Sequence, residues 1–247
     1  MKKFLKLFGT IALVALIGFS MVSCIEDDIN DNGSSGDSSS DFTYEENNGL
    51  ITITKYKGQG GNVTIPSKIG GKPVTVIGNR SFEGCTSITG ITIPDSVTSI
   101  LEAAFSACSS LTSIIIPNSV TKIDDYTFHN CIGLTSVTIP NKVTIIGARA
   151  FDGCTGLTGI TIPNSVNKID TSAFIRCTGL ASITIPASVT SINDWAFIEC
   201  TSLTSVTFEG TPAIGSIAFP GDLARKYDAG GKGTYTRQYG SDIWTKE

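Results

Sequence analysis

Apolar residues recur with a fixed step of 23 positions along most of the chain. One position of this period holds phenylalanine, and cysteine follows three residues later. The six pairs are Phe82 and Cys85, Phe105 and Cys108, Phe128 and Cys131, Phe151 and Cys154, Phe174 and Cys177, and Phe197 and Cys200. A proline keeps the same step from Pro94 to Pro186. Pro66 precedes Pro94 by 28 residues, which places five extra residues in Lys68–Pro73. A period of this length indicates stacked structural repeats.

Each copy contains two short segments that predict strands. The first, such as Thr158–Ile162, is rich in threonine and β-branched residues and stops at a proline, which cannot donate a ladder hydrogen bond. The second, such as Val166–Ile169, is usually followed by Gly, Asp or Asn, which tight turns favour. A compact turn, in most copies Ala-Phe-x-x-Cys, then leads onward. The L-x-x-L-x-L spacing at this period is the leucine-rich-repeat signature. We therefore expect a mainly β, right-handed leucine-rich-repeat solenoid with 23-residue coils.

A single coil cannot be stable alone. Its roughly six buried apolar side chains contribute about 10–18 kcal/mol, whereas ordering 23 residues costs about 1–2 kcal/mol each. The coils must therefore share apolar faces, and both ends of the stack need caps. We expect an N-terminal β-hairpin cap over residues 42–65, repeats over 66–208 and a C-terminal α/β cap over 209–247. Within the C-terminal cap, Asp222–Ala229 is predicted to form a helix with Asp222 as its N-cap. Thr234–Trp244 reads as a strand whose Tyr235, Tyr239 and Trp244 seal the core.

The repeated phrase I-P-x-S-V-T-x-I-x-x-x-A-F-x-x-C-x-x-L-T-S-I resembles the BspA-type leucine-rich repeats of bacterial surface proteins. The resemblance extends from about Phe42 to Glu247 and includes the tail after the last repeat. It implies the solenoid fold, and it implies a surface protein that holds host matrix proteins or other cells. It identifies no particular ligand.

The N-terminal segment indicates export. Residues 1–23 combine a basic start with an apolar stretch from Leu7 to Phe19, as in a secretory signal peptide. Met21-Val22-Ser23-Cys24 resembles a lipobox, which implies cleavage before Cys24 and lipidation of that residue. An ordinary signal peptide followed by an incidental cysteine is the alternative. Residues 24–41 are acidic and rich in Ser and Gly, which predicts a flexible tether that lifts the domain off a membrane.

Charge argues against nucleic acid as a partner. Lys2, Lys3 and Lys6 are the only charged residues of the first 24, so the rest of the chain holds 15 basic and 22 acidic residues. Nucleic-acid-binding proteins present a basic face, and no long basic run follows Lys6.

The six repeat cysteines share one position of the coil, so their side chains should form a column pointing the same way. Disulfides need facing Cβ atoms about 3.8 Å apart, and zinc needs convergent ligands. We expect buried thiols acting as small hydrophobes with a weak S–H donor. Disulfides remain the alternative.

No enzyme is indicated. His129 is the only histidine, and its repeat position holds Glu83, Ser106, Asp152, Ile175 and Ile198 in the other coils, which suggests a surface position. The carboxylates lie mainly at turns, where Asp is favoured for backbone reasons. We expect no catalytic residue, no metal site and no cofactor.

Two surfaces could receive a partner. The outward residues of the longer predicted strands are mostly Ser and Thr, which suits a solvated face or a glycan-binding module. The position two residues before each repeat phenylalanine varies instead, and it collects residue types that dominate interfaces. It holds Arg80, Ala103, Tyr126, Arg149, Ser172 and Trp195, with Ile175, Arg176 and Ile198 in nearby turn positions. The alternative is that Tyr126 and Trp195 merely cover the core.

The sequence thus predicts a lipid-anchored protein at the cell envelope or outer surface, with a monomeric repeat domain. Its candidate binding residues are Arg80, Tyr126, Arg149, Trp195, Ile175, Arg176 and Ile198. The leading function is adhesion through a macromolecular, protein partner. A structural or self-associating envelope component, or a glycan-binding module, remains the alternative.

Overall fold

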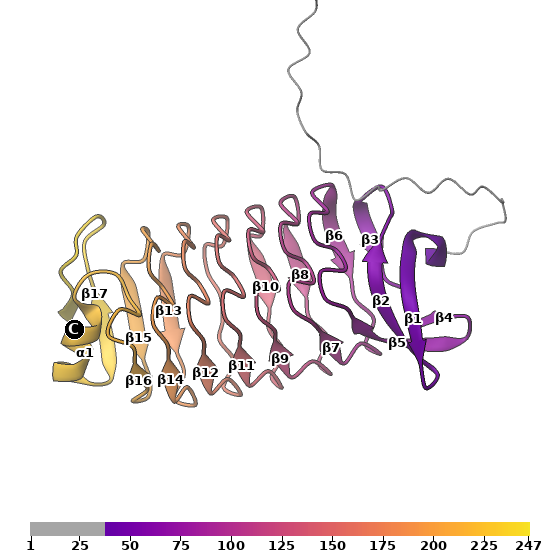
Figure 1. Cartoon of the computed structure of the whole chain (residues 1–247). Helices are drawn as coiled ribbons and strands as arrows, with labels where there is room; N and C mark the ends of the chain where they lie inside the picture. The colour runs from indigo at the N-terminus through magenta and orange to yellow at the C-terminus, as the bar shows by residue number, and fades with distance from the viewer. Residues whose placement is uncertain (1–37) are drawn as a thin grey trace, which may run out of the picture.

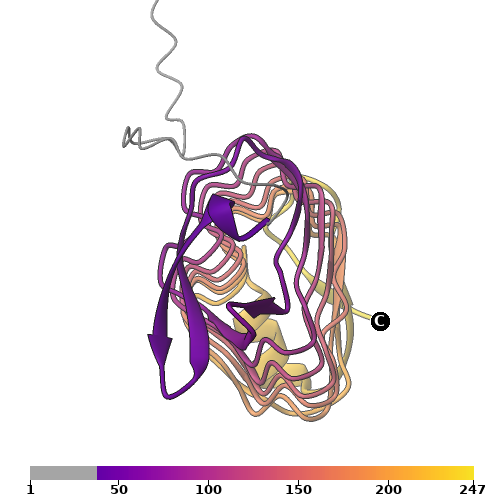
Figure 2. The ribbon, with the colours of Figure 1, turned by 90° about the vertical axis from the view of Figure 1, so that its right-hand side faces the viewer.

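The computed structural model describes residues 38–247, so the predicted signal peptide, Cys24 and most of the tether lie outside the described residues. The chain forms a single elongated stack of coils, capped by a hairpin at one end and by a helix at the other (Figure 1). Viewed along the stack, the coils superimpose closely (Figure 2). We number the coils by their phenylalanine, from coil 1 at Phe82 to coil 6 at Phe197, with a shortened coil 7 at Phe219. The predicted solenoid is confirmed.

Short strands form a column along one side of the stack. They pair in parallel with isoleucines in register in two runs, one from Lys72 to Ile100 and one from Lys122 to Ile214, and no ladder joins Ser99–Ile100 to Lys122–Ile123. The strands are β5 (Lys72–Ile77), β7 (Ser99–Ile100), β9 (Lys122–Ile123), β11 (Ile145–Ile146), β12 (Lys168–Ile169), β14 (Ser191–Ile192) and β16 (Ala213–Ile214). Because each strand has its isoleucine side chain pointing inward, this column forms one wall of the core.

The longer strands form a second column that is interrupted. One sheet contains β3 (Gly61–Thr64), β6 (Ile88–Thr92), β8 (Ser113–Ile115) and β10 (Ser136–Thr138); another contains β13 (Ser182–Ile185) and β15 (Ser205–Phe208). The strand expected at Thr158–Ile162 of coil 4 is absent. Val137 and Ile160, which lie beside this break, are only partly buried, as is the equivalent Ile91 of coil 1, whereas Ile114 and Ile183 are buried.

The N-terminal end is closed by a β-hairpin, as expected. After a 3-10 turn at Ser38–Asp41, β1 (Phe42–Asn47) pairs antiparallel with β2 (Leu50–Tyr56), and β2 pairs in parallel with β5. Residues 62–65 differ from the expectation, because β3 extends the longer sheet by pairing with β6 instead of completing the cap. The five extra residues of coil 1 form a small antiparallel hairpin in which β4 (Lys68–Ile69) pairs with β5.

The C-terminal end is closed by α1 (Leu223–Gly230) and by β17 (Gly233–Thr236) and β18 (Thr245–Lys246). Asp222 precedes the helix but makes no side-chain capping bond; its Oδ1 accepts from the Trp244 backbone N–H at 2.8 Å instead. Tyr235 and Trp244 are buried, as expected. Tyr239 is 76 % exposed, so the prediction that it seals the core is wrong. It lies in a loop between β17 and β18, where no strand holds its ring inward.

The core is filled by a column of phenylalanine rings beside a column of cysteines. Neighbouring rings from Phe105 to Phe219 stack with centroids 4.7–5.7 Å apart. In coils 2 to 6 each thiol is free and buried, and it donates to the phenylalanine carbonyl of the preceding coil at 3.1 Å. Burial raises the pKa of Cys108 and of Cys200 to about 12. Cys85 is buried in the same column, so all six repeat cysteines lie in the core, as expected.

Candidate docking surface on the loop edge

The turns around the repeat phenylalanines form one edge of the stack, here called the loop edge. In every turn from coil 1 to coil 6, the residues two before and two after the phenylalanine adopt a left-handed backbone. In coil 4, Arg149 has φ 54° and Gly153 has φ 72°. The N–H groups of both, and of Phe151 between them, donate to coil 5 at 2.8–3.0 Å. Each turn is therefore locked to its neighbour, and the side chains of its left-handed residues are carried on a rigid backbone.

A left-handed backbone costs an L-residue about 1–2 kcal/mol, a cost that glycine avoids. None of the six coils has glycine two residues before the phenylalanine. Arg80, Arg149 and Trp195 are exposed at this position, Tyr126 is half-buried, and Ala103 and Ser172 are buried. Trp195 is 47 % exposed, which removes the alternative that it covers the core.

A buried carboxylate organises the middle of the loop edge. Asp152 follows Phe151 and is fully buried. Its Oδ1 accepts from Arg176 Nε at 2.9 Å and from Arg176 Nη2 at 2.6 Å. Its Oδ2 has no hydrogen-bond partner, although Arg149 Nη1 and His129 Nε2 each lie 3.7 Å away. Residues from coils 3, 4 and 5 therefore converge on one carboxylate.

Aromatic rings complete this cluster. The Arg149 guanidinium lies 5.8 Å from the Tyr126 ring centroid, within cation–π range. The Tyr126 ring meets His129 edge to face at 5.8 Å. Tyr126, Arg149 and Arg176, which the sequence placed in separate coils, are thus brought together.

The position of His129 is not the surface position that the sequence suggested. Ser106 and Asp152 occupy it in the neighbouring coils and are buried, because the residue after the phenylalanine lies partly under the following turn. The His129 side chain is 25 % exposed, and burial is the main cause that lowers its pKa.

Ser106, His129 and Asp152 form a Ser–His–Asp series, since Ser106 Oγ lies 3.3 Å from His129 Nδ1. The geometry does not suit nucleophilic catalysis. Ser106 is only 4 % exposed, so a substrate cannot reach its hydroxyl. The backbone N–H groups of Ser106 and Ala107 donate to carbonyls of Ala103 and His129, which leaves neither to stabilise an oxyanion.

Apolar side chains continue the loop edge toward the C-terminus. Trp195 is joined by Ile217, which is 43 % exposed and occupies the equivalent position of coil 7. Ile175 and Ile198 are half-buried in the turns of coils 5 and 6. The apolar part therefore follows directly after the cluster around Asp152.

Arg80 stands apart from both. It lies in coil 1, is 65 % exposed and faces Glu83 at 3.8 Å. The equivalent residue of coil 2, Ala103, is buried and presents no side chain that could connect Arg80 to Tyr126. The structure thus brings together six of the seven candidate binding residues and leaves Arg80 outside.

Asp152 and Ile217 are functional candidates that the sequence reasoning missed. A spacing of 24 between an acidic and a basic residue, one more than the repeat, was available as a signal for Asp152 and Arg176. Ile217 was hidden because coil 7 is one residue shorter, which shifts it out of the 23-residue register.

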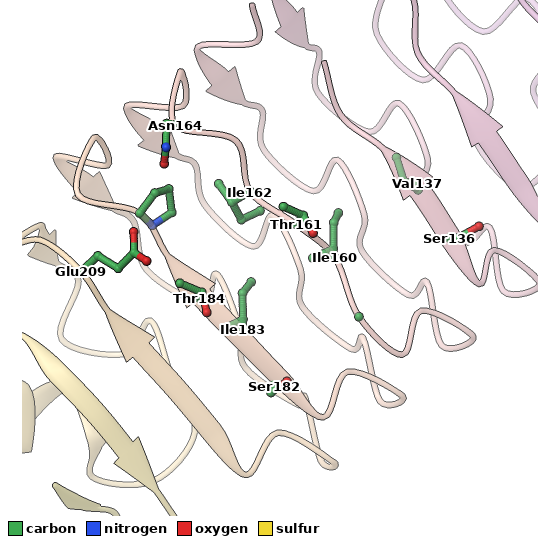
Figure 3. A pocket seen from close by; sticks show the side chains of 12 residues that line it. Ser136, Val137, Ile160, Thr161, Ile162, Asn164, Ser182, Ile183, Thr184 and Glu209 are labelled. Carbon is green, nitrogen blue, oxygen red and sulfur yellow. The ribbon is translucent and has the colours of Figure 1, made fainter. Parts of the chain in front are cut away.

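The sheet face offers a separate groove at the interruption of the longer column. It has a volume of about 600 Å³. Small and hydroxylated residues form most of the lining, and these are Ser136, Gly159, Thr161, Ser182 and Thr184 (Figure 3). The apolar Val137 and Ile160 and the polar Asn164 and Glu209 complete it. Among the lining residues only Glu209 is charged, and none is aromatic. This groove therefore presents mainly hydroxyl groups and one carboxylate, unlike the loop edge.

No helix among residues 38–247 has the length and apolar character needed to cross a bilayer. The same residues contain no group of three or more His, Cys, Asp and Glu side chains that could hold a metal ion.

Comparison with known proteins agrees with this architecture. Residues 56–180 and 121–224 match the BspA type Leucine rich repeat region, with six copies. Among solved structures, the T. pallidum leucine rich repeat protein is 31 % identical to this chain with a TM-score of 0.72, over 78 % of this chain and 94 % of that one. A leucine-rich repeat protein from Bacteroides ovatus is 27 % identical with a TM-score of 0.57, over 77 % of this chain and 55 % of that one. No curated protein sequence shows a significant match. The chain belongs to the BspA-type leucine-rich-repeat family.

Proposed function

We propose that this protein is a non-enzymatic surface lipoprotein that docks a protein partner on its loop edge and thereby adheres to host matrix or to another cell. One observation carries the docking proposal: Arg149 and Trp195 are exposed and Tyr126 is half-buried, on turns that hydrogen bonds lock to the neighbouring coil. Membership of a family of bacterial surface type supports an outward-facing role.

The docking surface comprises Tyr126, Arg149, Ile175, Arg176, Trp195, Ile198 and Ile217. Tyr, Trp and Arg are the residues most enriched among interface hot spots. Their backbones are fixed by hydrogen bonds between coils, so little conformational entropy of the turn is lost on binding.

Adherence of cells to surfaces coated with extracellular-matrix proteins or with a second cell type tests this proposal. Cells that produce the Arg149→Ala/Trp195→Ala double variant should adhere at background level. Tyr239→Ala is the matched control, because it removes an aromatic ring of 76 % exposure from the C-terminal cap, away from the loop edge. Adherence of the double variant at the wild-type level would refute the docking surface. Concentration-dependent sedimentation of the wild-type domain alone would favour the self-associating alternative.

The anchor is a separate part of the proposal. Lipidation of Cys24 would attach the domain to a membrane, and residues 25–41 would give it reach. Mass spectrometry of the N-terminal peptide should find a diacyl-glyceryl modification on Cys24, and Cys24→Ala should release the protein from the membrane fraction. Protease treatment of intact cells should remove the domain. Survival of the domain would place it on an inward-facing surface.

Glycan binding is the second candidate, and the groove on the sheet face favours it. Its partly exposed Val137 and Ile160 could pack against a sugar ring while Ser and Thr hydroxyls bond its edges. Gly159→Arg would fill the groove, since a Cβ there meets no atom within 4 Å. Loss of binding to a glycan array on this substitution, with cell adherence retained, would separate the two sites.

A further inference from the structure

Positive charge at the centre of the loop edge exceeds what the protein neutralises. Arg176 donates two hydrogen bonds to Asp152, through Nε and Nη2. Arg149 makes no side-chain hydrogen bond to any of residues 38–247, and its closest approach to the same carboxylate is 3.7 Å. One carboxylate therefore serves two guanidinium groups. Within this cluster the guanidinium groups outnumber the carboxylate by one, in a chain that is acidic overall.

The groups that face this cluster do not remove the surplus. His129 Nε2 lies 3.7 Å from the same Oδ2 of Asp152 as Arg149 Nη1, and an imidazole is either neutral or positive, so His129 cannot offset positive charge. Glu83 also acts on His129, but it lies in coil 1 and already faces Arg80 at 3.8 Å.

The geometry of the two arginines suits a carboxylate ligand. Arg149 Nη1 lies 3.7 Å from Oδ2 of Asp152 and Arg176 Nη2 lies 2.6 Å from Oδ1, so both guanidinium groups lie around a single carboxyl group. Their side chains are 47 % and 45 % exposed, and the Tyr126 ring supports Arg149 from one side. A guanidinium group presents planar donors that fit the two oxygens of a carboxylate.

The neighbouring residues define what must flank that carboxylate. Trp195 and Ile217 expose 47 % and 43 % of their surface, and Ile175 and Ile198 lie half-buried between them and Arg176. Covering this area stabilises a complex only if the partner contributes apolar side chains. A free anion or a sulfated polysaccharide carries no such groups.

We propose that the docking surface recognises a protein segment in which an Asp or Glu side chain lies beside aliphatic or aromatic residues. The carboxylate bridges Arg149 and Arg176, and the apolar side chains cover Trp195 and Ile217. This inference rests on the proposed docking function and specifies the chemistry of its partner.

Trp195 provides a built-in reporter, because the only other tryptophan, Trp244, is fully buried in the C-terminal cap. The probes are three ligands: a short acetylated peptide with one Glu between Leu and Phe, the same peptide with Gln, and a heparin oligosaccharide. Binding is followed by Trp195 fluorescence and by NMR shifts of the arginine Nε–H signals. The Glu peptide should change the Trp195 fluorescence and the Arg149 Nε–H chemical shift together. It should bind at least tenfold more tightly than the Gln peptide.

Variants separate recognition from folding. Arg149→Gln should weaken the Glu peptide about tenfold and leave the Gln peptide unchanged, since Arg149 holds no other hydrogen bond among the described residues. Arg176→Gln combined with Asp152→Asn avoids a buried unpaired charge and should have the same effect. Arg225→Gln is the control for net charge, because Arg225 is 83 % exposed on α1.

Each outcome decides the question. Equal binding of the Glu and Gln peptides overturns the carboxylate inference while leaving the docking surface intact. Tighter binding of heparin than of the Glu peptide, without a Trp195 response, assigns the arginines to a polyanion and overturns it as well. A Trp195 signal that no peptide perturbs rejects both this inference and the docking surface.

Discussion

Truncating Phe151 tests the central physical claim about the fold, which is that the coils share one continuous apolar column. Phe151 is fully buried, and its ring stacks on Phe128 at 5.3 Å and on Phe174 at 5.2 Å. Phe→Ala at a buried site costs about 3–5 kcal/mol from lost transfer free energy and the cavity left behind. Two ring contacts of about 0.5–1.5 kcal/mol each are lost with it. We expect Phe151→Ala to lie toward the upper end of that range.

The position of Phe151 also predicts how the variant unfolds. In a repeat protein each coil is stabilised by its two neighbours, so the substitution weakens both interfaces of coil 4. Both tryptophans lie on the C-terminal side of coil 4. Urea unfolding should therefore give different midpoints by tryptophan fluorescence, which reports the C-terminal coils, and by far-UV circular dichroism, which reports the whole stack.

The control and the refuting result are defined by exposure. Ile115→Ala removes a side chain that is 72 % exposed on the sheet face and should change the free energy of unfolding by less than about 0.5 kcal/mol. If Phe151→Ala changes it by less than about 1 kcal/mol, the phenylalanine column does not hold the coils together.

Three further predictions concern the thiols, the loop edge and the C-terminal cap. Burial raises the pKa of Cys108 and Cys200 to about 12, above the value of about 8.5 in an unfolded chain. As the pH rises, the thiols of the unfolded state therefore lose their protons before those of the folded state. The free energy of unfolding should be constant below about pH 8.5 and fall above it, by up to about 1.4 kcal/mol per pH unit for each buried thiol. Equal urea midpoints at pH 8 and pH 10.5 would contradict this. Trp195→Gly should leave the free energy of unfolding within about 1 kcal/mol of wild type. The strain of the left-handed backbone is relieved, and this offsets the larger conformational entropy that glycine loses on folding. A larger loss in urea unfolding would give the ring a structural role. Arg237→Met should lower the free energy of unfolding by about 1.5–3 kcal/mol and shift Trp244 emission to the red. Arg237 donates to the Leu203 and Ser241 carbonyls, and its guanidinium lies 5.0 Å from the Trp244 ring. Unchanged emission would show that Arg237 does not hold the cap closed.

Much of the fold could be read from spacing alone. The phenylalanine and cysteine positions recur at one step in coils 1 to 6, and a side chain repeated at the period of a stack must face the same way in each coil. The buried columns follow from this. The missing strand at Thr158–Ile162 could not be foreseen, because its residues match those of paired strands such as β13, and whether neighbouring backbones come close enough to pair depends on the spacing of whole coils.

The loop edge shows the same division. Its variable residues could be selected from the sequence because they depart from a closely repeated text, and Trp195 proved exposed. Which of these residues lie together could not be predicted from the sequence. Arg80 also lies two residues before a repeat phenylalanine, and yet it lies outside the cluster.

The sequence by itself determined the period, the inward columns and the residues that vary from coil to coil, because these depend only on identity and spacing along one chain. Tertiary structure alone decided that Asp152 is buried between two arginines, that Ser106 is inaccessible beside His129, and that Ile217 joins Trp195. Burial, charge balance and pKa are set by neighbours from other coils, and those neighbours are known only once the coils are stacked.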